Sequence, residues 1–248
     1  MNTLSPITPD IIPHQIALSG FTTRQGGVSR HPFDSLNLGL SASDDPAAVR
    51  ENYSRLYRHL GIDGTNTALM RQIHDAAVIK VSKGGMYDAV DGLVTDTPGL
   101  LLGVKVADCA PVLLLDPFSR AAGVIHCGWR SLVSGILENT LSLMKLEWNT
   151  DPAEVIFTLG PSAGPCCYQV GEEVAARMAP SSIKNRNGKL YADLHEEIIH
   201  RLIYNGARRT NVESIPDCTI CNNSLYFSHR RDGVNSGRMM GYIMLKDL

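Results

Sequence analysis

The chain has 248 residues, with 23 basic and 25 acidic side chains and a formal net charge of −2 at pH 7. This length can bury a sizeable core without disulfide bonds. The chain has no Lys/Arg-rich block, no signal-peptide pattern and no run of 18 apolar residues, which argues against nucleic-acid and membrane partners and favours a cytoplasmic protein with reduced thiols.

Three segments carry the signals of amphipathic helices. The first follows Asp45, a favourable N-cap, places Pro46 at its first helical position and stops at Gly61. The second covers residues 131–148 and the third covers residues 192–206, each with apolar residues at helical spacing. We therefore expect three amphipathic helices packed on a core.

Short runs rich in leucine or β-branched residues predict strands, several of them apolar on both faces as in covered sheets. Strands and helices intermix without a strict βαβ rhythm, and no linker, repeat or low-complexity segment divides the chain. We therefore predict one α+β domain over residues 1–248, a compact fold of mixed β-sheets flanked by helices. The predicted strands are 77–81, 100–106, 112–115, 122–125 and 155–159.

Three reactive side chains lie at the ends of predicted strands. Cys109 follows the strand at 100–106, His126 follows the strand at 122–125, and His74 follows another strand-like run. The ends of strands in a shared sheet are neighbours in space, and functional residues concentrate on the loops there. The three side chains can therefore converge on one pocket.

Two chemistries fit these three residues, and their spacing does not choose between them. A His/Cys/His set leaves one tetrahedral position open, as in catalytic zinc sites that lower the pKa of bound water. Without a metal, a histidine could hold Cys109 as a thiolate that attacks an amide or ester. Structural roles also fit, because single histidines and free cysteines often pack in cores and Asp108 could cap a turn.

Two further stretches are candidate anion binders. Arg24 stands beside a Gly-Gly pair in "FTTRQGGVS", where backbone N–H groups could meet a phosphate, although a plain turn fits equally well. Arg130 and Ser131 lie at the start of a predicted helix, where unpaired N–H groups favour an anion.

The chain contains a Cys-x-x-Cys pair, Cys218 and Cys221. Structural zinc sites generally combine such a pair with further ligands at similar spacing. No second pair of this spacing accompanies it, so the sequence predicts packing thiols here and not a metal site.

Eight stretches, taken together, resemble a known family. In order they are "FTTRQGGVS", "SLNLG", "RQIHDAAV", "DGLVTDTPGLLLGVKVADCAPVLLLDP", "AGVIHCGWRS", "GPSAGPCCYQVG", "ADL" and "FSHRRDGVNSGR". Their order and spacing are similar to those of the laccase-domain proteins, also called the multicopper polyphenol oxidase-like, purine nucleoside phosphorylase-like or peptidoglycan editing factor family. The resemblance runs from about Phe21 to the C-terminus.

The resemblance implies an α/β sandwich of mixed sheets and one zinc ion held by His74, Cys109 and His126 at the reacting centre. Copper suits this set less, because a multicopper site needs more histidines than the 8 of this chain can supply near one pocket. The implied activity is phosphorolysis of adenosine, inosine, guanosine and methylthioadenosine to base and sugar 1-phosphate, together with deamination of adenosine to inosine.

For that activity we assign substrate-binding roles beyond the three ligands. Arg24 and Arg130 are the candidates to hold phosphate through bidentate contacts, and Asn37 the candidate to bind ribose hydroxyls. Asp108 or Asp75 is the candidate proton shuttle in deamination.

The chain departs from the family pattern at three positions. Asp75 stands where the family usually has Gly, Cys127 where it has Ala, and His229 where it favours an aromatic residue. Asp75 and Cys127 adjoin the expected ligands, so they bear on metal affinity and substrate preference.

Three alternatives to the phosphorylase stay open. Cys109 could be the nucleophile of an amidase acting on a peptidoglycan precursor. The older family name suggests copper-dependent oxidation of phenols. A small-molecule-binding or metal-storage protein without catalytic turnover is the non-enzymatic alternative.

Overall fold

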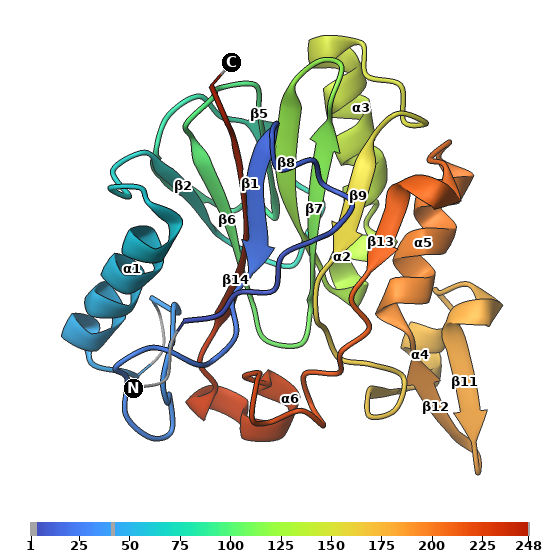
Figure 1. Cartoon of the computed structure of the whole chain (residues 1–248). Coiled ribbons are helices and arrows are strands. Elements are labelled where there is room, and N and C mark those ends of the chain that lie inside the picture. Colours follow the sequence, from blue (N-terminus) through green and yellow to red (C-terminus); the bar gives the residue numbers. More distant parts are fainter. Residues whose placement is uncertain (1–3, 41–42, 248) are drawn as a thin grey trace.

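The protein is described here by a computed structural model that covers residues 4–40 and 43–247. In this part of the chain two large β-sheets lie face to face, with helices over the outer face of each (Figure 1). Both sheets contain parallel and antiparallel pairs. The predicted α+β fold of mixed sheets flanked by helices is therefore confirmed.

The first sheet brings together strands from both ends of the chain. The N-terminal strand pairs with the C-terminal one, and the latter pairs with a strand from the middle of the sequence. Its order is β1 (Ala17–Phe21), β14 (Met239–Leu245), β6 (Leu101–Val106), β2 (Thr67–Arg71) and β4 (Gly85–Asp88).

The second sheet is built around an antiparallel hairpin of two fully buried strands. A small third sheet lies beside it and comprises β10 (Gln169–Val170), β12 (Lys189–Ala192) and β11 (Ile183–Arg186). The order in the second sheet is β13 (Val212–Ser214), β9 (Ile156–Leu159), β7 (Ala110–Asp116), β8 (Ala121–Cys127), β5 (Gly92–Thr95) and β3 (Val78–Lys80).

Strand β7 shows why several strands are apolar on both faces. Leu113 and Leu115 lie in the core between the two sheets, whereas Val112 and Leu114 lie in the core under the helices of the second sheet. Successive side chains of a strand point to opposite faces, so a strand covered on both sides needs apolar residues at every position.

Helix α1 (Pro46–Leu60) covers the outer face of the first sheet, and the sequence predicts it closely. The Asp45 carboxylate accepts the Ala47 N–H, and Gly61 ends the helix with a φ of 72°. Its apolar residues Val49, Tyr53 and Leu56 are buried in a cluster with Leu69, Leu101 and Met240 of the sheet.

The helix predicted over 131–148 is two helices. Helix α2 (Trp129–Val133) ends at Ser134, and α3 (Ile136–Trp148) begins after Gly135, whose φ of 89° is accessible to glycine at low cost. The apolar spacing runs through this break, so periodicity alone does not reveal it.

Helices α3 and α5 (Leu194–Tyr204) cover the second sheet, and α5 matches the third predicted helix (Figure 1). No helix within 4–40 and 43–247 is long and apolar enough to cross a bilayer. The remaining helical segments are α4 (Glu172–Ala175), α6 (His229–Asp232) and the short turns η1 (Pro180–Ser182), η2 (Arg209–Asn211) and η3 (Gly233–Asn235).

Candidate active site

His74, Cys109 and His126 come together where their strands end. One ligand atom from each lies within 4.8 Å of the other two. The imidazole rings of His74 and His126 have centroids 4.7 Å apart and are inclined at 76°. His126 is buried, Cys109 half-buried and His74 exposed, so the cluster has one solvent-facing side.

The strand register explains why Cys109 and His126 meet. Strands β7 and β8 are antiparallel, and Ala110 at the start of β7 pairs with Cys127 at the end of β8. Cys109 and His126 therefore flank the same end of the hairpin. Asp108 has a φ of 90°, a conformation that costs free energy in a non-glycine residue and often occurs at functional sites.

A carboxylate that the sequence analysis did not select organises both histidines. Asp91 is fully buried, and its Oδ1 accepts hydrogen bonds from His126 Nδ1 (2.8 Å) and from the His74 N–H (3.0 Å). Its Oδ2 accepts the N–H groups of Ile73 and Asp75. Burial opposes ionisation, but the hydrogen bonds from His126, Asp75 and Ile73 outweigh it and lower the pKa of Asp91.

Cys109 and His126 favour a thiolate and an imidazolium in the metal-free protein. Burial would raise the pKa of the Cys109 thiol, but His126 and His74 outweigh it and lower the pKa to about 6. Burial would lower the pKa of His126, but Cys109 and Asp91 raise it to about 9. The same thiolate is the form that binds a metal.

A cavity of about 720 Å³ opens beside these three side chains. Its size is typical of sites for small organic ligands. Positively charged side chains dominate its lining, while Asp108 is the carboxylate among its described lining residues. The cationic lining residues are Arg71, Lys105, Arg130, Arg230 and Arg238.

Among the described residues, most of these cations form no ion pair with a carboxylate, although the charge of Asp108 acts on Arg238. Arg71 forms an ion pair with Asp88, but within the described residues no carboxylate lies in ion-pair distance of Lys105, Arg130, Arg230 or Arg238. The cavity therefore has an excess of positive charge next to the three candidate ligands, which suits an anionic ligand.

Of the two arginines predicted to bind phosphate, one lines the cavity and the other does not. Arg130 lines the cavity, with its guanidinium 4.4 Å from the Trp129 ring centroid. Arg24 is not among the lining residues: it donates to the backbone oxygens of Asp34 and Asn223 and stacks over Phe227.

Asn37 is fully buried and is not one of the residues that line the cavity. Its Oδ1 accepts the N–H groups of Gly39 and Arg238, and its Nδ2 donates to Asp44. Asn37 thus fixes the backbone of Arg238, which does line the cavity.

The candidate proton shuttles also have defined partners. Asp108 accepts the Thr219 hydroxyl at Oδ1 (2.7 Å) and the Arg230 N–H at Oδ2 (2.6 Å). The exposed Asp75 accepts the Ala76 N–H. Of the two other unusual positions, Cys127 is buried in the core, where burial raises the pKa of its thiol, and His229 lines the cavity.

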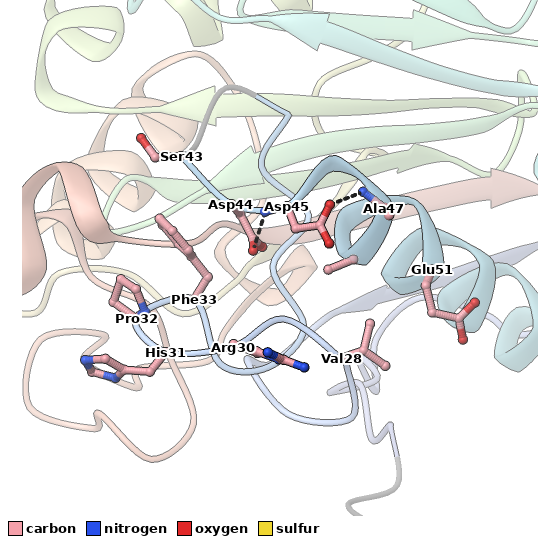
Figure 2. A pocket seen from close by; sticks show the side chains of 11 residues that line it. Val28, Arg30, His31, Pro32, Phe33, Ser43, Asp44, Asp45, Ala47 and Glu51 are labelled. Atoms are coloured by element: carbon pink, nitrogen blue, oxygen red, sulfur yellow. Dashed lines mark hydrogen bonds between the residues drawn. The ribbon is translucent and has the colours of Figure 1, made fainter.

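A second hollow, of about 640 Å³, is drawn in Figure 2. None of its lining residues lines the first cavity. Two of its carboxylates accept hydrogen bonds from neighbouring backbone N–H groups. Asp44 accepts the Asp45 N–H, and Asp45 accepts the Ala47 N–H at the start of α1. These contacts stabilise the helix start, and this hollow has no cluster of metal ligands among its described residues.

A second cluster of side chains that could hold a metal ion lies outside the cavity lining. Cys166, Cys167, Cys218 and Cys221 each place a sulfur within 4.8 Å of the other three. From the sequence, Cys218 and Cys221 are interpreted as packing thiols because no second pair accompanies them, whereas the structure places two further cysteines beside them. The chain supplies the missing pair as two consecutive cysteines some fifty residues earlier.

The donor set of His74, Cys109 and His126 fits one first-row metal ion. Two imidazoles and one thiolate suit zinc or copper, and three protein ligands leave a coordination position for substrate or water. Among the described residues, no further His, Cys or carboxylate group joins this set to hold additional ions.

Comparisons with known proteins agree with this architecture. The family model described as multi-copper polyphenol oxidoreductase laccase matches residues 18–246. Purine nucleoside phosphorylase YlmD of Geobacillus stearothermophilus is 34% identical over 93% of this chain and 91% of its own length. Purine nucleoside phosphorylase ORF3 of Streptomyces griseus is 37% identical over 91% of this chain and 93% of its own. The crystal structure of YlmD from Geobacillus stearothermophilus has a TM-score of 0.89 at 32% identity, covering 93% of this chain and 92% of that one.

Proposed function

This chain belongs to the multi-copper polyphenol oxidoreductase laccase family, and from that premise we propose that it is a zinc-dependent purine nucleoside phosphorylase. The names of its relatives support this activity. The observation that carries the proposal is the cationic cavity beside His74, Cys109 and His126. A phosphorolytic enzyme must bind a nucleoside and an inorganic phosphate side by side, and such a cavity offers room and charge for both.

The metal would be held by His74, Cys109 and His126. Asp91 accepts the Nδ1 proton of His126 and so leaves Nε2 of that ring available as a ligand. A bound zinc ion would act as a Lewis acid toward an oxygen or nitrogen of the substrate. Because thiol ligands persist in a reducing compartment, we also propose a cytoplasmic location.

The phosphate would lie among Lys105, Arg130, Arg230 and Arg238. In phosphorolysis a phosphate oxygen forms a bond to C1′ of the sugar while the bond from C1′ to the base nitrogen breaks. Positive side chains hold the dianionic nucleophile at the sugar, which lowers the entropic cost of the encounter. We assign phosphate binding to these four residues; the roles predicted for Arg24 and Asn37 would be indirect, through the loops they fix.

The purine would lie in the apolar part of the same cavity. Met70, Met86 and Val106 line it, as do the aromatic rings of Trp129 and Tyr168. Both rings already carry an arginine on one face, so Arg130 and Arg230 connect the aromatic part of the cavity with its cationic part.

The test is to incubate the purified, zinc-loaded protein with adenosine, with and without phosphate, and to separate the products. We expect adenine and ribose 1-phosphate in equal amounts, and no adenine when phosphate is left out. Adenine release without phosphate would indicate hydrolysis and contradict the proposal. Inosine, guanosine and methylthioadenosine tested in parallel give the substrate range.

The same assay tests the deaminase activity that the family resemblance implies. Deamination would yield inosine whether or not phosphate is present. A conversion that requires phosphate and yields adenine and ribose 1-phosphate, but no inosine, would leave the phosphorylase proposal intact and remove the deaminase from it.

One alternative is supported by a specific observation. The low pKa of Cys109, about 6, suits a nucleophile as well as a ligand, and so fits an amidase that acts on a peptidoglycan precursor. An amidase of this kind would be inactivated by alkylation of metal-free protein and would not act on nucleosides. Copper-dependent phenol oxidation predicts activity restored by copper and not by zinc.

A further inference from the structure

The four-cysteine cluster, formed by Cys166, Cys167, Cys218 and Cys221, joins two loops far apart in sequence. Cys166 and Cys167 lie between β9 and β10, and Cys218 and Cys221 follow β13. The Cys221 sulfur lies 3.2 Å from the sulfur of Cys166 and 3.2 Å from that of Cys167. None of these side chains has a role in the proposed phosphorylase.

The sulfur spacing fits a single tetrahedral ion. With a zinc–sulfur bond of about 2.3 Å, the sulfurs of a tetrathiolate site lie about 3.8 Å apart. Here the observed separations include 3.2 Å and reach at most 4.8 Å, so small side-chain rotations would bring all four sulfurs to such positions.

A disulfide fits the arrangement less well. It would use one partner of Cys221, whereas Cys221 is equally close to Cys166 and Cys167. A disulfide bond also requires sulfurs about 2.05 Å apart. The Cys218 sulfur further accepts the Gly164 N–H at 3.3 Å, which is a contact typical of cysteine ligands whose negative charge is stabilised by backbone N–H groups.

We propose that Cys166, Cys167, Cys218 and Cys221 bind a second zinc ion, distinct from the one at His74, Cys109 and His126. Binding forms four zinc–sulfur bonds and releases the four thiol protons, with no change in oxidation state. All four coordination positions are filled by protein, so the site is structural.

The second ion would fasten two loops that reach the cavity. Ser162 and Cys218 form an isolated parallel bridge between them. One loop continues to Tyr168, whose ring carries the Arg230 guanidinium at 5.0 Å. The other continues to Thr219, whose hydroxyl donates to Asp108. The zinc would therefore position one wall of the cavity without touching substrate.

The test is elemental analysis of the full-length protein, purified in zinc-containing, oxygen-free buffer with a thiol reductant. The background is a His74→Ala/Cys109→Ala variant, which retains one of the three ligands of the first site. We expect about one zinc per chain in this background. Adding Cys218→Ser/Cys221→Ser should remove it, whereas adding Cys127→Ala, a thiol outside both sets, should not.

Cobalt substitution identifies the ligands independently. In the His74→Ala/Cys109→Ala background, a tetrathiolate site predicts intense thiolate-to-cobalt charge-transfer absorption. The Cys127→Ala variant should keep this absorption. Absence of bound zinc and of this absorption from the background variant would overturn the proposal.

Thiol labelling covers the case in which serine variants do not fold. Cys166 and Cys221 are exposed, so an alkylating probe should modify both rapidly in chelator-treated wild-type protein and at least tenfold more slowly after zinc is restored. Equal rates would overturn the proposal, as would a Cys221 disulfide with Cys166 or Cys167 in protein never exposed to oxygen.

Discussion

The Oδ1 atom of Asp91 lies 2.8 Å from the Nδ1 atom of His126, and both side chains are buried. The same oxygen accepts the N–H of His74. One carboxylate therefore orients one imidazole through its ring and the other through its backbone. Such supporting contacts fix the orientation of a histidine ligand and raise its basicity, and so tune the affinity for the metal.

Replacing Asp91 by Asn should weaken metal binding at the three-ligand site by about 10–100-fold. The amide keeps the shape of the side chain but loses the negative charge that polarises His126, and its NH₂ group faces backbone donors. The affinity can be measured by competition with a chromophoric chelator. Asp96→Asn is the matched control, because Asp96 pairs with Lys80 and Trp148. Equal zinc affinity in wild type and Asp91→Asn would contradict the role of Asp91.

Gly128→Ala should impair the site through sterics alone. An added Cβ would lie 2.9 Å from the Cys109 sulfur and 3.6 Å from His74 Cδ2, so the sulfur must move away from its partners. The backbone φ of Gly128 is −89°, which alanine adopts without strain. We expect at least tenfold weaker zinc binding with a melting temperature close to that of the wild type, measured by chelator competition and circular dichroism. A loss of fold in place of zinc affinity would disprove this prediction.

The sequence predicts a helix well when capping residues stand at both of its ends. Asp45, Pro46 and Gly61 mark the ends of α1, and each contributes as expected. The break between α2 and α3 escapes the same logic because Gly135 sits inside a continuous apolar repeat. Whether such a glycine is tolerated within a helix or ends it depends on the packing of both halves, which the sequence pattern does not contain.

In the candidate site, too, the sequence reveals some of the functional residues and not others. His74, Cys109 and His126 stand out because reactive residues interrupt apolar runs. Asp91 does not, since an aspartate before a glycine is typical of turns. The four-cysteine cluster depends on two loops meeting, so the spacing within either loop could not reveal it.

His195 should make the protein less stable in mild acid. It is buried, with Nδ1 2.7 Å from the Ser214 hydroxyl and Nε2 3.0 Å from the Gly160 carbonyl oxygen. Burial lowers the pKa of His195 below the usual histidine value of about 6.5. The unfolded chain therefore binds more protons than the folded one as the pH falls below 6.5, and stability falls with it, by at most about 1.4 kcal/mol per pH unit.

Urea unfolding at a series of pH values measures this effect. His195→Gln should flatten the dependence of the unfolding free energy on pH below neutrality, at some cost in stability at pH 7. His200→Gln is the control, because His200 is exposed on the same helix. A slope unchanged in His195→Gln would mean that other groups cause the acid sensitivity.

Lys105 should make phosphate binding sensitive to alkaline pH. Burial, together with the positive charges of Arg71 and Arg238, lowers the pKa of Lys105 to about 8. The ammonium group is thus present below pH 8 and is lost as the pH rises through this value. If Lys105 holds phosphate, the KM for phosphate should rise about tenfold between about pH 7 and about pH 9. This rise corresponds to about 1.4 kcal/mol of lost binding free energy.

Two substitutions separate this effect from other titrations. Lys105→Arg keeps its charge throughout this range, so its KM for phosphate should stay nearly constant. Lys105→Met should have, at every pH, the raised KM that the wild type reaches at alkaline pH. Lys83→Met, which removes an exposed lysine outside the cavity, should behave as the wild type does. An alkaline rise that persists in Lys105→Arg would assign the titration to another group, because a guanidinium does not lose its proton there and the positive charge facing the phosphate would not have changed.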